Sequence, residues 1–171
     1  MKPTIKHMST DKVRGKRAKY RRGDCLSISY DQLTFYASFI AQKTSKHYYL
    51  TLIDYKEPRK PTMQDFASAR YFGILIPAAM GYVHGPEEHM LPRLDMDADN
   101  SLEKAGTLEL SAEAISGCIT NTGSVEALIA SYDTRIAALT QKTQAIADGT
   151  LAPKLRLQLL DISTILHSTT G

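Results

Sequence analysis

The chain has 171 residues, of which 43% are hydrophobic and 23% are charged, and it carries a net charge of +3. This length fits one domain with a tail and is enough to bury a core without disulfides or metals. The sequence has no apolar run of about eighteen residues, and no apolar segment follows its basic N-terminus. It therefore predicts neither a transmembrane helix nor a secretory signal peptide. We expect a cytoplasmic protein in which Cys25 and Cys118 are buried, reduced thiols, with a disulfide as the alternative.

The charge is unevenly distributed along the chain. Residues 1–24 carry nine lysines and arginines against two aspartates, a charge of +7, and the remaining residues carry −4. Residues 1–19 show no apolar periodicity, so they are expected to form a flexible basic arm. The basic residues that this arm offers for contacts are Arg14, Lys16, Arg17, Lys19, Arg21 and Arg22.

Three strands are predicted after the arm. A Gly23-Asp24 turn precedes an apolar alternation over residues 25–30, and a run rich in aromatic and β-branched residues covers 33–41. After a polar turn, residues 47–55 alternate most clearly and place tyrosines on both faces of the strand. Strands joined by such short turns indicate an antiparallel meander.

The middle of the chain predicts a short helix, a strand and a long loop. Thr62 is a candidate N-cap, with Asp65 in the first turn of a helix that ends before residue 71. Residues 71–76 are an apolar run that Pro77 is expected to end. Residues 81–106 contain several glycines and prolines and an acidic run, so we expect an irregular loop. Residues 107–110 and 117–120 are further strand candidates.

Helical spacing begins after residue 122. It predicts a long amphipathic helix over about 124–147. Residues 153–167 favour a second helix, although 155–159 also alternate as a strand would. The expected fold is α+β: a flexible arm (1–19), a small antiparallel sheet or barrel (20–121) and a helical hairpin (122–171). The hairpin would pack on the sheet or form a homodimer through an apolar stripe of Leu155, Leu159, Ile162 and Leu166.

Two segments of the sequence resemble parts of metal-binding motifs. The aspartates at 95, 97 and 99 resemble the start of a calcium loop, but Gly106 stands where the bidentate glutamate belongs. His84 and His89 are five residues apart around a Gly-Pro pair, which disfavours the helical spacing of a zinc pair. The sequence therefore predicts no metal and no other cofactor.

Catalytic patterns are equally weak. Cys25, His47 and Asp54 would have to meet across neighbouring strands to form a nucleophilic triad, and Cys25 lies in an apolar alternation typical of a buried thiol. Gly81 and Gly85 are not followed by the lysine of a phosphate-binding loop. We expect a binding protein rather than an enzyme.

Aromatic and acidic residues indicate a surface for protein recognition. Twelve of the thirteen tyrosines and phenylalanines lie between Tyr20 and Tyr82, and some of these tyrosines are expected to face outward beside the acidic run. The residues predicted to bind a partner are Asp95, Asp97, Asp99, Glu103, Tyr48 and Tyr82.

Several short segments occur in a familiar order. They are 20–24 (YRRGD), 25–28 (CLSI), 36–40 (YASFI), 49–55 (YLTLIDY), 61–62 (PT), 65–66 (DF) and 71–73 (YFG). Over about residues 16–120 the chain resembles the immunity protein 26 family of bacterial polymorphic-toxin systems. The resemblance implies a small, mainly β domain that opens with a Gly-Asp turn.

The resemblance also implies a function. An immunity protein binds a cognate toxin in the cytoplasm and neutralises it by occluding its active site. The acidic run would then face a basic toxin, or the basic arm an acidic one. The alternative is a nucleic-acid-associated small β-barrel that uses its basic arm to neutralise phosphates. A third reading is a hydrolase that uses Cys25 or His47.

Overall fold

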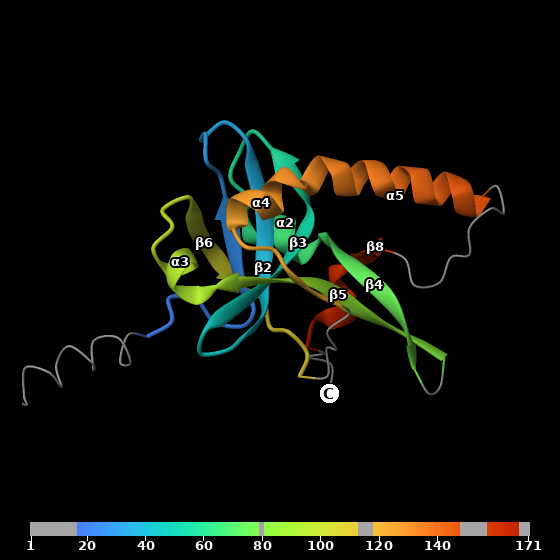
Figure 1. Ribbon diagram of the computed structural model, residues 1–171, viewed down its shortest axis with the longest axis horizontal. Coiled ribbons are helices and arrows are strands. Elements are labelled where there is room, and N and C mark those ends of the chain that lie inside the picture. Colours follow the sequence, from blue (N-terminus) through green and yellow to red (C-terminus); the bar gives the residue numbers. More distant parts are fainter. Residues whose placement is uncertain (1–16, 79–80, 113–117, 148–156, 168–171) are drawn as a thin grey trace, which may run out of the picture.

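The computed structural model describes residues 17–78, 81–112, 118–147 and 157–167, with the side chains of 75–84 and 140–147 left aside. The α+β class is confirmed: a mixed sheet of eight strands is accompanied by short helices and one longer helix (Figure 1). The elements are β1 (Asp24–Ile28), β2 (Phe35–Lys43), β3 (His47–Glu57), α2 (Met63–Ala67), β4 (Arg70–Ala78), β5 (Gly81–Pro92), α3 (Arg93–Asp97), β6 (Leu102–Thr107), β7 (Cys118–Asn121), α4 (Val125–Ala130), α5 (Tyr132–Ala147), β8 (Leu157–Asp161) and the 3-10 helix η1 (Ile162–Ile165).

The predicted meander of three strands is confirmed. β1, β2 and β3 pair antiparallel in sequence order, and β6 adds to the outer edge of β1. Along the sheet the order is β6-β1-β2-β3-β4-β5-β7, with β8 on β4 and a further pairing of β3 with β5. In the described chain every pairing between named strands is antiparallel except that of β5 with β7.

The predicted loop over residues 81–106 is wrong, because β5, α3 and β6 occupy most of it. β5 continues through its Gly-Pro pair because it pairs with a different strand on each side of that pair. Its first half pairs with β4 as far as Pro86, and its second half pairs with β3 from His89 onward. Pro86, which has no N–H to donate, is the last residue of the ladder with β4, and a proline is tolerated where a ladder ends. β5 therefore belongs to two parts of the sheet and bends between them.

Each face of the meander packs into its own core. One core, here called the α4–α5 core, contains Tyr48, Leu50 and Leu52 of β3 together with Leu128 and Tyr132 of the helices. The other, the α2–η1 core, is built from alternate strand residues and from the short elements on the opposite face: Phe39, Ile53, Phe66, Ile162 and Ile165. Because both faces are covered, β1 is buried at all five positions.

The C-terminal part departs from the expected helical hairpin. The long helix is confirmed as α4 and α5, which are separated at Ser131. In Figure 1 α4 crosses in front of the sheet and α5 continues from it toward the side where β4 and β8 lie. The second helix is wrong, since residues 157–161 form strand β8, which pairs with β4. The sequence of this segment is compatible with a helix or a strand, and hydrogen bonding to the free edge of β4 stabilises the strand.

The apolar stripe proposed for dimerisation is therefore not a helix face. Ile162 is fully buried in the α2–η1 core, and Leu159 packs against the α4–α5 core. Leu166 is partly buried and forms a bridge with Leu110, whereas Leu155 lies outside the described residues. These side chains are used within the chain, which removes the basis for a homodimer through C-terminal helices.

Smaller predictions had mixed outcomes. The helix start at Thr62 is confirmed as a capping box, in which Thr62 and Asp65 each accept the other's backbone N–H. Pro77 does not end β4, which runs on to Ala78. The strand predicted at 107–110 is wrong, because β6 ends at Thr107.

Candidate functional site

A surface pocket of about 240 Å³ lies where the β1–β2 loop, α3 and the start of α4 meet. Its lining combines an apolar group, three acidic side chains and one phenol. The ten lining residues are Tyr30, Leu91, Pro92, Asp95, Met96, Asp99, Gly123, Ser124, Val125 and Glu126. Three of the ten are acidic and none is basic. The pocket is therefore a candidate site for a cationic group.

Local sequence signals explain why these segments meet. Pro92 ends β5 and stands at the N-cap of α3, so the chain turns there. On the opposite wall Ser124 caps α4 by accepting the N–H of Ala127, and Gly123 before it has φ +87°, a conformation that favours glycine. In the β1–β2 loop Asp31 accepts the backbone N–H groups of Leu33 and Thr34.

Tyr30 links the loop to the acidic wall. Its hydroxyl donates to Oδ2 of Asp99 at 2.8 Å, while Oδ1 of Asp99 accepts the N–H of Ser101 at 2.8 Å. Burial and the carboxylates of Asp99 and Glu126 raise the pKa of the Tyr30 phenol above its ordinary value. Tyr30 therefore stays a neutral donor, and the negative charge of the pocket resides on its three carboxylates.

The acidic residues predicted from the sequence separate into three groups. Asp95 and Asp99 line the pocket. Asp97 does not, because its side chain is only 4% exposed and accepts hydrogen bonds from the Tyr48 hydroxyl, the Lys19 N–H and Arg93. Glu103 lies on β6, where it forms an ion pair with Lys60 at 2.9 Å, and it does not line the pocket.

The two tyrosines predicted to bind a partner do not serve as expected. Tyr48 is completely buried, so its assignment is wrong: it stacks edge-on with Tyr20 and accepts the N–H of Tyr20 at 3.1 Å. The side chain of Tyr82 lies outside the described residues. The idea of an exposed tyrosine beside acidic residues applies instead to Tyr30, which is 43% exposed.

The end of the basic arm is attached to the fold. Arg22 donates to the carbonyl oxygens of Ala41, Leu110 and Ser111, which holds three segments together. The Lys19 ammonium lies 5.6 Å from the centre of the Tyr20 ring, and Arg17 and Arg21 are exposed. Arg14 and Lys16 lie outside the described residues. Arg22 thus contributes to the fold, and its predicted contact role stays a prediction because the residue is exposed.

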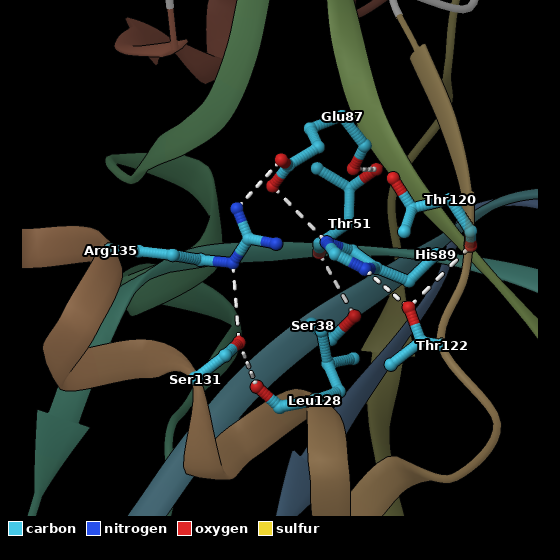
Figure 2. Close-up of polar contacts among 9 residues, drawn as sticks. All are labelled: Ser38, Thr51, Glu87, His89, Thr120, Thr122, Leu128, Ser131 and Arg135. Carbon is cyan, nitrogen blue, oxygen red and sulfur yellow. Dashed lines mark hydrogen bonds and ion pairs between the residues drawn. The ribbon is translucent and has the colours of Figure 1, made fainter. Parts of the chain in front are cut away.

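A largely buried polar network between β5 and the α4–α5 segment was not predicted (Figure 2). Glu87 accepts from Arg135 at 2.6 Å and contacts Nε2 of His89 at 3.1 Å. Nδ1 of His89 lies 2.7 Å from the Thr122 hydroxyl, just before α4. Arg135 also donates to Ser131, whose hydroxyl donates to the Leu128 carbonyl. These contacts attach α4 and α5 to β5 from both ends of α4.

The network continues into the meander. The Thr51 hydroxyl donates to the backbone carbonyl of Glu87 at 3.0 Å, and the Ser38 hydroxyl donates to the Thr51 carbonyl at 2.9 Å. Beside it, Gln42 donates to Glu88 at 2.6 Å. Burial alone would raise the pKa of Glu87, but the contact with His89 and the charge of Arg135 outweigh burial and hold it below the ordinary value.

A Glu–His–Thr sequence of contacts is also the layout of a catalytic triad. Here, however, the His89 side chain is only 2% exposed, and none of the three residues lines the pocket. The imidazole is thus buried among the described residues, and its two contacts link β5 to the segment before α4.

The chain was compared with known proteins. No family model matches it, and searches among curated proteins and among solved structures also found no match. No helix of the described residues has the length and apolar character needed to cross a membrane.

The triad and metal sites considered from the sequence are not assembled. Cys25 is buried in the α2–η1 core, whereas Asp54 accepts hydrogen bonds from Arg70 and from Tyr132 of the other core. No group of three or more metal-ligating side chains occurs within the part of the chain that the structure describes. Cys25 and Cys118 are both free, and Cys118 is only partly buried.

Sequence reasoning missed Glu126, Tyr30 and the Glu87–His89 pair. Glu126 looked like an ordinary residue of an exposed helix face. Glu87 and His89 fall within the segment 81–106 that the sequence predicts as a loop. Their i, i+2 spacing, which places both side chains on one face of a strand, was the available signal, but it has meaning only once residues 81–92 are known to be a strand.

Proposed function

We propose that this protein binds a cognate bacterial toxin with a basic surface and neutralises it by covering the toxin's active site. The proposal follows the sequence resemblance to immunity proteins. The observation that supports it best is the acidic pocket with its exposed apolar border. In this proposal the chain acts as a binding protein rather than as an enzyme.

The border of the pocket has the composition of a protein interface. Large apolar side chains are exposed beside it: Tyr30 at 43%, Leu94 of α3 at 54% and Leu33 of the β1–β2 loop at 73%. Tyrosine is among the residues that are enriched in protein interfaces and in their hot spots. Leu94 is exposed on α3 next to Asp95 in sequence.

Charge gives this surface a preferred partner. Asp95 and Glu126 form no ion pair with any described residue, and Asp99 is bound only by neutral donors. Unpaired carboxylates around a pocket attract a basic partner and raise the rate of association, most strongly at low salt. A basic toxin, such as a nuclease that binds nucleic acid, has the complementary charge.

The first experiment is capture of partners from the lysate of the native cell, with and without nuclease treatment. The wild-type protein is compared with the double variant Asp95→Asn/Glu126→Gln, which neutralises two pocket carboxylates. The control Glu103→Gln/Glu109→Gln makes the same change of net charge at exposed positions that do not line the pocket.

The proposal predicts one stoichiometric toxin-like partner that resists nuclease, is lost in the pocket variant and is retained in the control. Equal capture by the wild-type protein and the pocket variant would contradict it. Recovery that disappears with nuclease would instead favour a nucleic-acid role for the basic arm, with steep salt dependence as its second sign.

A further inference from the structure

The pocket is small. Its volume of about 240 Å³ lies below the range of about 300–1,000 Å³ that is usual for sites of drug-sized ligands. A site of this size accommodates a single long side chain. A side chain of a partner protein is a ligand that fits this volume.

The walls specify the chemistry of that residue. Leu91, Met96 and Val125 contribute apolar surface and are almost completely buried, whereas the carboxylates of Asp95 and Glu126 belong to exposed residues. A ligand that matches both parts has an aliphatic stem and a cationic end. Only lysine and arginine among the standard side chains have this combination with a permanent charge at neutral pH.

The acceptors favour arginine over lysine. Three carboxylates come from two different walls, α3 with its following turn and the start of α4. Asp99 already accepts two hydrogen bonds, and a carboxylate has acceptor positions for about four. A planar guanidinium with five N–H donors can reach separated acceptors at once, and it stacks on an aromatic ring such as that of Tyr30.

We propose that the pocket binds one arginine side chain of the partner protein, with the guanidinium among Asp95, Asp99 and Glu126 and the aliphatic stem over the small part of Leu91, Met96 and Val125 that remains exposed. This inference rests on the proposed function, since it identifies the anchor residue of the basic partner. It makes the pocket the centre of the interface and the exposed apolar residues its border.

The test uses blocked amino acids and needs no toxin. N-acetyl-arginine methylamide is titrated into the full-length protein while amide shifts are followed by NMR, and the citrulline and lysine analogues are titrated in parallel. Citrulline has the shape of arginine without the charge. Saturable shifts at Tyr30, Val125 and Glu126 are expected for arginine, with weaker binding of lysine and none of citrulline.

Variants locate the site. Glu126→Gln and Asp95→Asn are each expected to weaken binding of the arginine analogue about two- to fivefold, the range for one partly solvated ion pair. Glu103→Gln is the charge-matched control and should leave binding unchanged. Absence of saturable shifts, equal binding of citrulline, tighter binding of lysine, or equal weakening by the control would overturn the inference.

The two proposals fail in different ways. If the arginine analogue binds as expected but no basic protein is captured from the lysate, the pocket is correct and the toxin-neutralising function is wrong. If a toxin-like partner is captured but the analogue does not bind, the function stands and the arginine anchor is wrong.

Discussion

Replacing Glu87 with glutamine tests whether the buried network holds the helices against the sheet. The substitution keeps the size of the side chain and removes its charge. Arg135 then loses the carboxylate at 2.6 Å, and His89 loses its charged neighbour at 3.1 Å. Both residues bridge β5 and the α4–α5 segment, so the change weakens the attachment of α4 and α5.

The expected loss of unfolding free energy at neutral pH is about 2–3 kcal/mol. Removal of one partner from a fully buried ion pair costs about 3–5 kcal/mol. The loss here is expected to be smaller for two reasons. The glutamine oxygen still accepts a hydrogen bond from Arg135. The Arg135 side chain is also 19% exposed to solvent and is therefore partly hydrated.

The loss depends on pH in a direction that the structure specifies. The pKa of Glu87 is lowered from the ordinary 4.5 when the protein folds. A carboxylate with a lowered pKa contributes stability that is complete above its unfolded pKa and disappears as the pH falls through its folded pKa. The difference between the wild-type protein and Glu87→Gln should therefore be constant above about pH 5.5 and shrink below about pH 4.5.

Urea unfolding followed by circular dichroism from pH 3 to pH 8 (about these limits) measures this difference. Glu88→Gln is the neighbouring control, since Glu88 is also buried on β5 and accepts a hydrogen bond from Gln42. A loss at neutral pH below about 1 kcal/mol, or a loss that does not shrink in acid, would refute the structural role of the Glu87–Arg135 pair.

Two further substitutions and one thiol-labelling reaction test the fold. Gly23→Ala should cost more than about 2 kcal/mol, because φ is +92° and the new Cβ would lie 2.3 Å from the Leu108 carbonyl oxygen; a midpoint of urea unfolding equal to wild type would contradict this. Tyr48→Phe should cost about 1–3 kcal/mol by leaving the Tyr20 N–H without its acceptor and removing one of the donors to Asp97, measured as a drop in melting temperature. Burial raises the pKa of Cys25 to about 12, so a thiol reagent should modify Cys25 only during unfolding; fast labelling of the folded protein would show that the α2–η1 core opens.

Local patterns were sufficient for the N-terminal half of the fold. The alternation over residues 47–55 correctly assigned Leu50 and Ile53 to opposite faces, because side-chain direction in a strand follows sequence parity. The capping box at Thr62 was likewise visible, since it depends on residues three apart. These features need no information from distant parts of the chain.

The C-terminal half needed tertiary information. Gly85 and Pro86 argue against a strand in isolation, yet β5 forms because β3 and β4 each offer it an edge. Residues 157–161 satisfy both periodicities in their apolar content, and only the free edge of β4 selects the strand. The pairing of β5 with β4 is a local hairpin, but the pairings of β5 with β3 and of β8 with β4 join residues far apart in sequence, which periodicity does not report.

The same distinction applies to the pocket. The acidic run was visible in the sequence, but its members differ in use: Asp97 completes a buried contact with Tyr48, while Asp95 and Asp99 face the pocket. Glu126 joins them because Thr122 is bound to His89 and thereby fixes the start of α4 beside α3. The wall that carries Glu126 is thus placed by a buried histidine on β5. Asp95 and Asp99 thus become part of a candidate binding site because the fold brings the carboxylate of Glu126 to them from more than twenty-five residues away along the chain.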